Sequence, residues 1–287
     1  MKRFIGRSKT FIKVLCITCP LFFPPFLWAE TAGRLPSFLN SHERLVRPDT
    51  TDITRLRFVT TFDFPPFNFL DKTGRIAGYN IDLLRAICEK LKLETVCEVE
   101  VLPWEDLVDY VKNGGAEAVI SGLKETDATY QDLVFTQTYL RFPARFVSSL
   151  SLSLAEPISN KLVYLKSGFI FKSAHEKLFH SYFPKAKWQG FRSRTELYKA
   201  LQNHEIDLVF DDGFALSVWL NDPQLARCCS FVGGAYMAPQ LLGEGMRIAV
   251  AKNNTKLVDV FNYALKALER DGKLTELYLR YFPINFY

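Results

Sequence analysis

Apolar and polar residues alternate along this chain in segments that predict strands and helices in turn. Residues 55–61 alternate in the manner of a half-buried strand. The sequence of residues 71–74 predicts a turn within a short hairpin. After Asn80 or Asp82, apolar residues recur at the spacing of one helix face; they are Ile81, Leu84, Ile87, Cys88 and Leu91. The pattern therefore predicts a strand, a hairpin and a helix in this order.

The alternation of predicted strands and helices continues to Leu150. The polar residues 151–160 interrupt it, and it restarts after them. Before the interruption it predicts strands at 95–102, 117–121, 134–139 and 144–149, and a helix at 104–112. After it, the expected elements are strands at 161–165, 206–210 and 246–251, and helices at 173–183, 193–202, 214–220, 255–268 and 274–280. Ser193 and Glu196 form a capping-box pattern. Strands that alternate with helices indicate βαβ units and largely parallel sheets.

The second block of elements ends in a strand and helices that have no partner block of their own. We therefore expect the end of the chain to return to the first block. This arrangement predicts a discontinuous first lobe, residues 55–147 plus 248–287, and a second lobe of residues 148–247. Strands near 144–149 and 246–251 would be the connections. Two lobes joined by a two-strand hinge form a clamshell with a ligand cleft.

The first 29 residues differ from the rest of the chain. They carry five basic residues and no acidic one, and the segment 14–28 is apolar apart from Thr18 and three prolines. This pattern predicts a cleaved secretory signal peptide that ends at Ala29 or Ala32. The alternative is a membrane anchor, for which the short, proline-interrupted run is poorly suited. Residues 30–54 would then be a polar N-terminal extension.

Without this leader the chain carries no excess charge. Five of its 36 basic residues lie in the leader, and the other 31 equal the 31 acidic residues. The net charge of +5 is therefore no argument for a nucleic-acid partner or a membrane surface. An apolar content of 48% supports a sizeable core and argues against a disordered chain.

Four cysteines remain after the leader, and export would place them in an oxidising compartment. Cys88 lies near the end of a predicted helix and Cys97 begins the next strand, a spacing that favours a disulfide. The adjacent Cys228 and Cys229 could form a vicinal bridge or remain buried thiols. The four histidines show no ligand spacing with the cysteines, so no metal site and no cofactor are expected.

Three short patterns carry a resemblance to a known family. They are Arg-x-Pro-Ala-Arg-Phe-Val at 141–147, the Cys228-Cys229 pair followed by Gly233-Gly234, and Leu-Tyr-Leu-Arg-Tyr-Phe-Pro at 277–283. From Arg55 to Pro283 the order of the elements and motifs resembles the family 3 extracellular solute-binding proteins, the periplasmic amino-acid receptors of ABC importers. The resemblance implies an α/β fold: a two-lobed periplasmic-binding-protein clamshell, type II-like, with mixed, mostly parallel sheets flanked by helices and a two-strand hinge.

In the first lobe the resemblance implies roles for residues in three loops. Phe64 matches the aromatic residue that stacks on the ligand; the alternative is a core residue of its loop. Trp104 matches a position that borders the pocket, or else is a core residue at a helix start. Ser121 and Gly122 match strand-end residues that offer a hydroxyl and backbone groups, and the carboxyl edge of a sheet is a common ligand site.

In the second lobe, Asp211 matches the carboxylate that pairs with a ligand amino group. The alternative for Asp211 is a helix N-cap, because it precedes Asp212, Gly213 and a predicted helix. The Gly-Thr pair that such receptors carry near a strand end corresponds to Gly168-Phe169 here. Gly168 is accordingly a candidate binding residue.

The chain departs from the family at Thr126-Asp127-Ala128-Thr129. Amino-acid receptors carry Thr-x-x-Arg here, and the arginine grips the ligand's α-carboxylate in a bidentate pair. Thr129 has no charge for this task, and a nearby proline of the family is replaced by Thr138. Three explanations stay open: Lys124 or Arg141 supplies the charge, the ligand lacks an α-carboxylate, or the site is degenerate.

These observations predict a periplasmic protein that binds a small polar solute, an amino acid or a related metabolite, and delivers it to an inner-membrane ABC permease. We expect a monomer without bond chemistry or a nucleic-acid partner. One alternative is a dehydratase of the prephenate or cyclohexadienyl type, with Asp211, Asp212 or Glu244 as the acid. Another is a solute sensor that does not serve transport.

Overall fold

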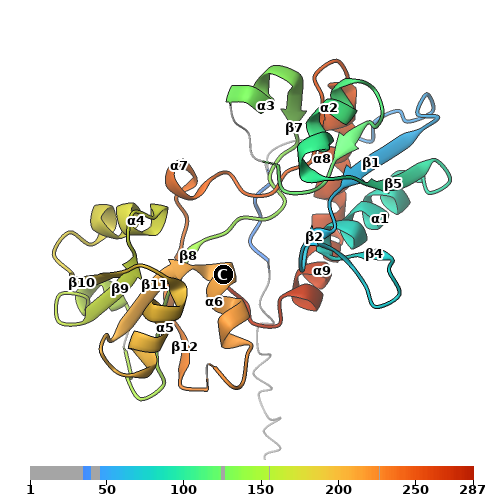
Figure 1. Cartoon of the computed structure of the whole chain (residues 1–287). Helices are drawn as coiled ribbons and strands as arrows, with labels where there is room; N and C mark the ends of the chain where they lie inside the picture. The colour runs from blue at the N-terminus through green and yellow to red at the C-terminus, as the bar shows by residue number, and fades with distance from the viewer. Residues whose placement is uncertain (1–34, 40–45, 124–126, 155, 226) are drawn as a thin grey trace, which may run out of the picture. The chain divides into compact units, whose positions relative to one another are not determined.

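The computed structural model describes residues 35–39, 46–123, 127–154, 156–225 and 227–287. The strands in these ranges form two five-stranded sheets and one three-stranded sheet (Figure 1). The predicted leader, residues 1–29, and Lys124 lie outside the described residues.

The first sheet combines segments from both ends of the described chain. Its strands are β1 (Leu56–Thr60), β5 (Cys97–Val101), β6 (Ala118–Val119), β7 (Leu133–Phe135) and β13 (Ala249–Ala251). Their order is β5-β1-β6-β13-β7, with β1, β5 and β6 parallel and β13 antiparallel to both of its neighbours. A late strand thus completes an early sheet, as the expected return of the chain requires.

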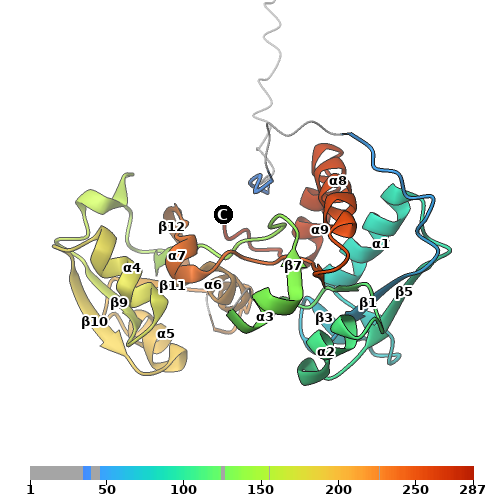
Figure 2. The ribbon, with the colours of Figure 1, turned by 90° about the horizontal axis from the view of Figure 1, so that it is seen from above.

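Helices cover both faces of the first sheet. On one face, α1 (Tyr79–Leu91), α8 (Lys256–Arg270) and α9 (Lys273–Tyr281) lie side by side (Figure 2). The other face carries η1 (Trp104–Asp106), α2 (Leu107–Lys112) and α3 (Asp127–Asp132). The apolar positions of α8 fall at helical spacing and are buried; they are Leu257, Val260, Phe261, Ala264, Leu265 and Leu268. Burial of this face, rather than intrinsic propensity, holds the helix on the sheet.

The second sheet lies wholly within the middle of the chain. Its strands are β8 (Ala144–Ser149), β9 (Lys166–Ile170), β10 (Lys187–Phe191), β11 (Leu208–Asp212) and β12 (Cys229–Tyr236). Their order is β10-β9-β11-β8-β12, with β9, β10 and β11 parallel and β8 antiparallel to both of its neighbours. The associated helices are η2 (Ile158–Asn160), α4 (Ala174–Tyr182), α5 (Arg194–Gln202), α6 (Gly213–Leu220) and α7 (Pro239–Leu242).

The predicted hairpin is present and gains a third strand. Here β2 (Asp63–Phe64) pairs with β3 (Asn68–Leu70), which pairs with β4 (Ile76–Ala77), all antiparallel. The carboxylate of Asp71 accepts hydrogen bonds from the backbone N–H groups of Thr73 and Arg75, which explains the turn. The predicted capping box is also present, since Ser193 accepts from the Glu196 N–H and Glu196 accepts from the Arg192 N–H.

The strands predicted for the second sheet were wrong in one position and incomplete. No strand forms at 161–165; the strand is β9, which begins at Lys166. The pattern did not indicate a strand at these residues, because Gly168 lies among them and glycine is unusual inside a strand. Here a Cβ on Gly168 would lie 2.5 Å from Ile206 Cδ1 and 2.7 Å from Leu197 Cδ1, so close packing requires the glycine. The strands β10 and β12 were not predicted at all.

The connections between the two large sheets also differ from expectation. β8 belongs entirely to the second sheet and β13 to the first, so neither is a connection, and a boundary at 147/148 would cut β8. The connecting segments are residues 136–143 and 237–248. An antiparallel bridge between Leu140 and Met246 joins them, with the Met246 N–H donating to the Leu140 carbonyl at 2.7 Å.

The described parts of the N-terminal extension have no helix or strand, as expected for a polar, irregular segment. Two leucines in it, Leu35 and Leu39, are nevertheless buried in the core formed by α1, α8 and α9. Phe38 packs against Tyr287 near the end of the chain, with ring centroids 5.5 Å apart. The extension therefore contributes apolar surface to the first α/β region.

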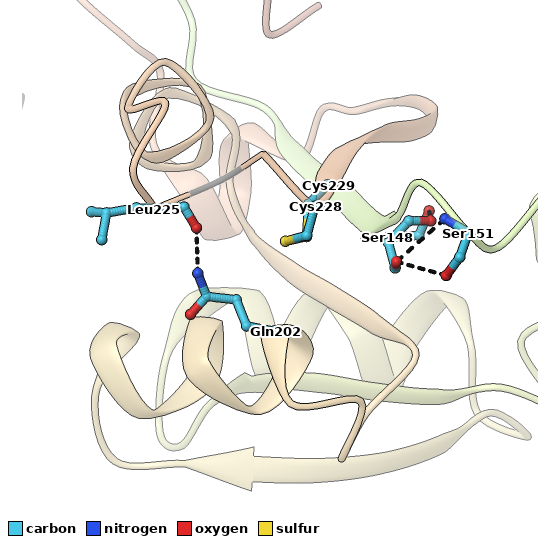
Figure 3. Close-up of a disulfide and its surroundings, with 7 residues drawn as sticks. Ser148, Ser151, Gln202, Leu225, Cys228 and Cys229 are labelled. Carbon is cyan, nitrogen blue, oxygen red and sulfur yellow. Dashed lines mark hydrogen bonds between the residues drawn. A yellow bond between two sulfur atoms is a disulfide. The ribbon is translucent and has the colours of Figure 1, made fainter.

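Both cysteine pairs form disulfides. The predicted Cys88–Cys97 bond joins α1 to β5, with a Cα–Cα distance of 6.3 Å. The second bond joins the adjacent Cys228 and Cys229, the alternative that the sequence had left open against free thiols. Figure 3 shows this pair near the end of α5, where the Gln202 side chain donates to the Leu225 carbonyl.

We expect the two disulfides to differ in their effect on stability. Replacing Cys88 and Cys97 with alanine should lower the free energy of unfolding by about 2 to 3 kcal/mol, because the bond joins residues 9 positions apart. The matched double replacement of Cys228 and Cys229 should cost only about 1 kcal/mol, because adjacent residues enclose almost no loop. Urea unfolding of both variants measures the difference, and equal losses would contradict the loop argument.

Candidate functional site

A cavity of about 340 Å³ lies beside the carboxyl end of β6. Loops from the first sheet, the connecting segments and α7 line it; the lining residues are Phe64, Gly122, Leu123, Phe142, Pro239, Leu242, Gly243, Glu244, Gly245, Met246 and Arg247. Its wall is mostly apolar, with one acid and one arginine. This composition suits a small solute that has an apolar body and a few polar groups.

The structure brings Phe64 and Gly122 together at this cavity. The Phe64 ring stacks on Phe67 with centroids 4.8 Å apart, and 38% of the Phe64 residue stays exposed. Gly122 has φ +75, and a Cβ there would lie 3.2 Å from Phe64 Cε1 and 3.3 Å from Met246 Cε. A glycine thus lets the aromatic ring lie against the end of the strand segment. The arrangement leaves one ring available to a ligand.

The loop that carries Phe64 is held by the start of α1. The first helical N–H groups, those of Tyr79 and Asn80, donate to the carbonyls of Pro66 and Phe67 at 2.9 and 3.0 Å. Gly78, the N-cap, has no side chain to perform this task. The loop backbone therefore caps the helix, and the helix in turn fixes the aromatic loop.

Ser121 lies at the same edge, but its hydroxyl is turned into the protein. Its Oγ accepts hydrogen bonds from the Thr61 N–H and from Asn68 Nδ2, both at 3.1 Å, and lies 3.0 Å from Thr61 Oγ1. The residue is 1% exposed. This hydroxyl therefore joins the ends of β1, β3 and β6, and leaves a ligand only backbone groups at this position.

Trp104 and Thr129 lie outside the residues that line the cavity. Trp104 begins η1 and is 49% exposed, so it is not a core residue of a helix start. Thr129, at the position of the missing arginine, lies in α3. Their predicted contacts with a ligand stay predictions.

Arg141 is near the cavity but already paired. Its Nη2 lies 3.3 Å from Glu244 Oε2, and its backbone N–H and carbonyl both bond to the Tyr287 hydroxyl. Its guanidinium also lies 5.9 Å from the Phe38 ring centroid. Arg141 thus ties the connecting segments to the chain end, with its charge offset by Glu244.

Arg247 is a cavity residue that the sequence reasoning missed. It lines the cavity, and its Nε donates to Thr138 Oγ1 at 3.3 Å. Thr138 in turn donates to the Glu244 carbonyl at 2.9 Å. Thr138 is therefore a partner of this arginine, and nothing in the local sequence around Arg247 indicated the contact.

Gly168 does not lie near the end of a strand, as was predicted. Gly168 is buried in the middle of β9, not near its end. The strand ends at Ile170, and Lys172-Ser173 precede α4. Lys172 has φ +58, a conformation in which glycine is favoured, and Ser173 accepts from the Glu176 N–H as the cap of α4. The residues between the end of β9 and α4 are therefore Phe171, Lys172 and Ser173, not Gly168.

Asp211 occupies the carboxyl end of β11 and is 1% exposed. Arg194 binds its carboxylate through Nε at 2.7 Å and Nη2 at 3.2 Å, and the Tyr198 hydroxyl donates at 2.9 Å. The helix cap that was the alternative for Asp211 is instead Asp212, which accepts from the Ala215 N–H. Asp211 is thus part of a buried ion pair rather than a cap.

Hydrogen bonding and burial shift the pKa values of three groups around Asp211. The hydrogen bonds to Asp211 raise the pKa of Arg194, so the guanidinium stays charged. Burial lowers the pKa of His175, whose Nδ1 lies 3.8 Å from Asp211. Burial also raises the pKa of Asp212. A guanidinium that stays charged thus lies against the buried Asp211 side chain.

No group of three or more His, Cys, Asp or Glu residues suited to a metal ion occurs among the residues that the structure describes. In the same residues, none of the helices has the length and apolar character needed to cross a bilayer.

Comparison with known proteins agrees with this arrangement. The sequence model of the bacterial extracellular solute-binding proteins, family 3, matches residues 56–284. The L-arginine-binding protein of Pseudomonas aeruginosa is 30% identical over 232 residues, 78% of this chain and 86% of that protein. ABC transporter arginine-binding protein 1 of Escherichia coli is 27% identical over 231 residues, 80% of this chain and 91% of that protein.

Solved structures share the fold at lower identity. The L-cystine solute receptor of Neisseria gonorrhoeae, unliganded and open, superposes with a TM-score of 0.67 at 19% identity, over 81% of this chain and 94% of that one. The second substrate-binding domain of Lactococcus lactis GlnP gives 0.65 at 19% identity, over 84% of this chain and all of that one. The described chain thus has the two-lobed α/β clamshell fold that was expected.

Proposed function

Because this chain belongs to family 3 of the bacterial extracellular solute-binding proteins and so has a solute-binding role, we propose that its solute is small and polar, an amino acid or a related metabolite. The protein delivers this solute to the permease of an ABC importer. It acts as a monomer in the periplasm after loss of the leader at residues 1–29. The family's periplasmic amino-acid receptors support this interpretation.

One observation carries the proposal: Phe64 and Gly122 meet at a cavity beside the end of a sheet strand. The exposed part of the Phe64 ring offers a flat apolar surface, and Glu244 and Arg247 line the same cavity. Aromatic surfaces with a few polar groups bind and orient small solutes. Binding then needs only a difference in affinity between two conformations of the protein.

The groups that a dehydratase would use as an acid are already engaged. Asp211 is held by Arg194, Asp212 caps α6, and Glu244 lies 3.3 Å from Arg141. The relatives compared above are binding proteins. Binding without turnover is therefore the function that the geometry supports best.

Thermal-shift screening of the mature protein against amino acids, polyamines, opines and aromatic acids tests the proposal. A true solute at about 100 times its Kd should stabilise the folded state by about 2.7 kcal/mol. For a chain of this size that corresponds to a rise in Tm of about 5 °C or more. If no compound of the panel raises the Tm, the proposed function fails.

A Phe64→Ala variant should bind the best compound of that panel about tenfold more weakly, because the aromatic contact contributes roughly 1 kcal/mol beyond its buried area. Phe62→Ala is the matched control: this ring is 49% exposed and does not line the cavity. Isothermal titration calorimetry measures both affinities. Equal losses in the two variants would remove Phe64 from the site.

A further inference from the structure

All four acceptor positions of the Asp211 carboxylate are occupied within the protein. Oδ2 accepts from Arg194 Nε at 2.7 Å and from the Tyr198 hydroxyl at 2.9 Å. Oδ1 accepts from Arg194 Nη2 at 3.2 Å and from the Asp212 N–H at 2.8 Å. A carboxylate offers about four lone-pair positions, so none is left for a ligand's ammonium group. The 1% exposure of Asp211 excludes such an approach as well.

Arg194 is in the opposite situation. Its guanidinium has five N–H donors, of which only two are accepted by groups in the described part of the chain, both on Asp211. Its side chain is 51% exposed, against 1% for that of Asp211. The ion pair therefore hides the carboxylate, while the half-exposed guanidinium keeps three N–H donors that no group in the described part of the chain accepts.

The location of Arg194 is that of a ligand-binding group. It is the first residue of α5, directly after β10, and α4 and α6 begin after the neighbouring parallel strands β9 and β11. Three helix N-termini with their partial positive charge thus meet the same carboxyl edge of the sheet. The other titratable groups beside Asp211 and Arg194 are Tyr198, His175 and Asp212, and the Asp212 carboxylate is engaged at the start of α6.

We propose that Arg194, positioned by Asp211, is the residue of this edge that contacts the solute, and that it binds a carboxylate of the solute. The inference rests on the proposed solute-binding function. A guanidinium fork matches the geometry of a carboxylate, and hydrogen bonds between charged groups are about twice as strong as neutral ones. Arg194 supplies the positive charge that Thr129 lacks, and Asp211 acts as a positioning residue instead of an ammonium receptor.

Two sets of three compounds distinguish these roles. The first set is L-arginine, agmatine and 5-guanidinopentanoate; the second is L-phenylalanine, phenethylamine and 3-phenylpropionate. In each set the second compound lacks the carboxylate and the third lacks the α-amino group. Thermal-shift and calorimetric titrations of the wild-type protein measure binding. We expect the compounds that have a carboxylate to bind, and agmatine and phenethylamine, which lack one, not to bind. Binding of an amine without the matching acid would overturn the inference and leave the proposed function intact.

Variants of Arg194 test the same point with every carboxylate of the screening panel that binds. Arg194→Lys keeps a cation beside Asp211, so the fold is preserved, but a lysine cannot offer the fork; affinity should fall about tenfold. Arg194→Gln should lower it about 30-fold. Arg75→Lys and Arg75→Gln are the matched controls, since the Arg75 side chain is 80% exposed in a hairpin turn.

The outcomes separate the two proposals. Unchanged affinity in Arg194→Lys overturns the role of Arg194 while the solute-binding function stands. If no compound of the panel or of the two sets stabilises the wild-type protein, both proposals fall together.

Discussion

Replacing Gly78 with alanine should lower the free energy of unfolding by about 3 kcal/mol or more, one of the two largest effects that we expect of a single substitution in this chain. Gly78 has φ +129 and ψ 173, a region of backbone space that is almost exclusive to glycine. A Cβ there would lie 2.2 Å from the Phe67 carbonyl oxygen and 2.9 Å from that of Pro66. These two carbonyls cap α1, so the new methyl group would push the aromatic loop off the helix.

Gly74→Ala is the matched control for this substitution. Gly74 also has a positive φ, +76, but a Cβ on it would have nothing within 4 Å. Its replacement should cost only the backbone strain, about 1 to 2 kcal/mol. Urea unfolding followed by circular dichroism measures both values. A loss for Gly78→Ala no greater than that for Gly74→Ala would mean that the loop does not depend on the close approach.

A second large effect is expected at Gly245, in one of the two connecting segments. Gly245 has φ +93, and a Cβ would lie 2.3 Å from the Leu140 carbonyl oxygen and 2.8 Å from Thr138 Cγ2. That carbonyl accepts the Met246 N–H in the bridge between the segments. Gly245→Ala therefore combines backbone strain with a clash at this bridge, and should destabilise the protein by about 3 kcal/mol.

Gly243 provides the comparison two residues earlier. Its φ of +90 is nearly the same, but a Cβ would meet no atom within 4 Å. Gly243→Ala should thus cost only the strain, about 1 to 3 kcal/mol. The difference between the two variants in the urea midpoint isolates the close contact between the connecting segments. If the two midpoints coincide, the contact of Gly245 with Leu140 contributes nothing to stability.

The positive charge that the resemblance leads us to expect near Thr129 has several candidate sources in this chain. Arg141 is paired with Glu244, and Arg247 lines the cavity with its Nε on Thr138. Arg194 holds Asp211 and keeps further donors accessible. The variants of Arg194 therefore address the question that Thr129 raised: which arginine takes over the carboxylate of the solute.

Much of the fold follows from local patterns of the sequence. The apolar spacing in α1 and α8 identified both helices, and the alternation in residues 55–61 identified β1. The capping-box residues Ser193 and Glu196 marked the start of α5. These signals are local, because a helix face or a strand face is a property of neighbouring positions. Where the local signal was weak, as in β9 with its buried Gly168, the strand was predicted at the wrong residues.

The amino-acid sequence by itself determined the α/β class, the two blocks and the Cys88–Cys97 bond. Only the tertiary structure decided which groups of the site remain accessible. Asp211 carries the right chemistry for an ammonium group, yet Arg194, 17 residues earlier, fills two of its acceptor positions. Such a pairing depends on how a helix packs on a sheet, and no spacing along the chain encodes it. The residue types of the sequence show which functional groups are present. The packing of the elements determines which of these groups a solute can reach.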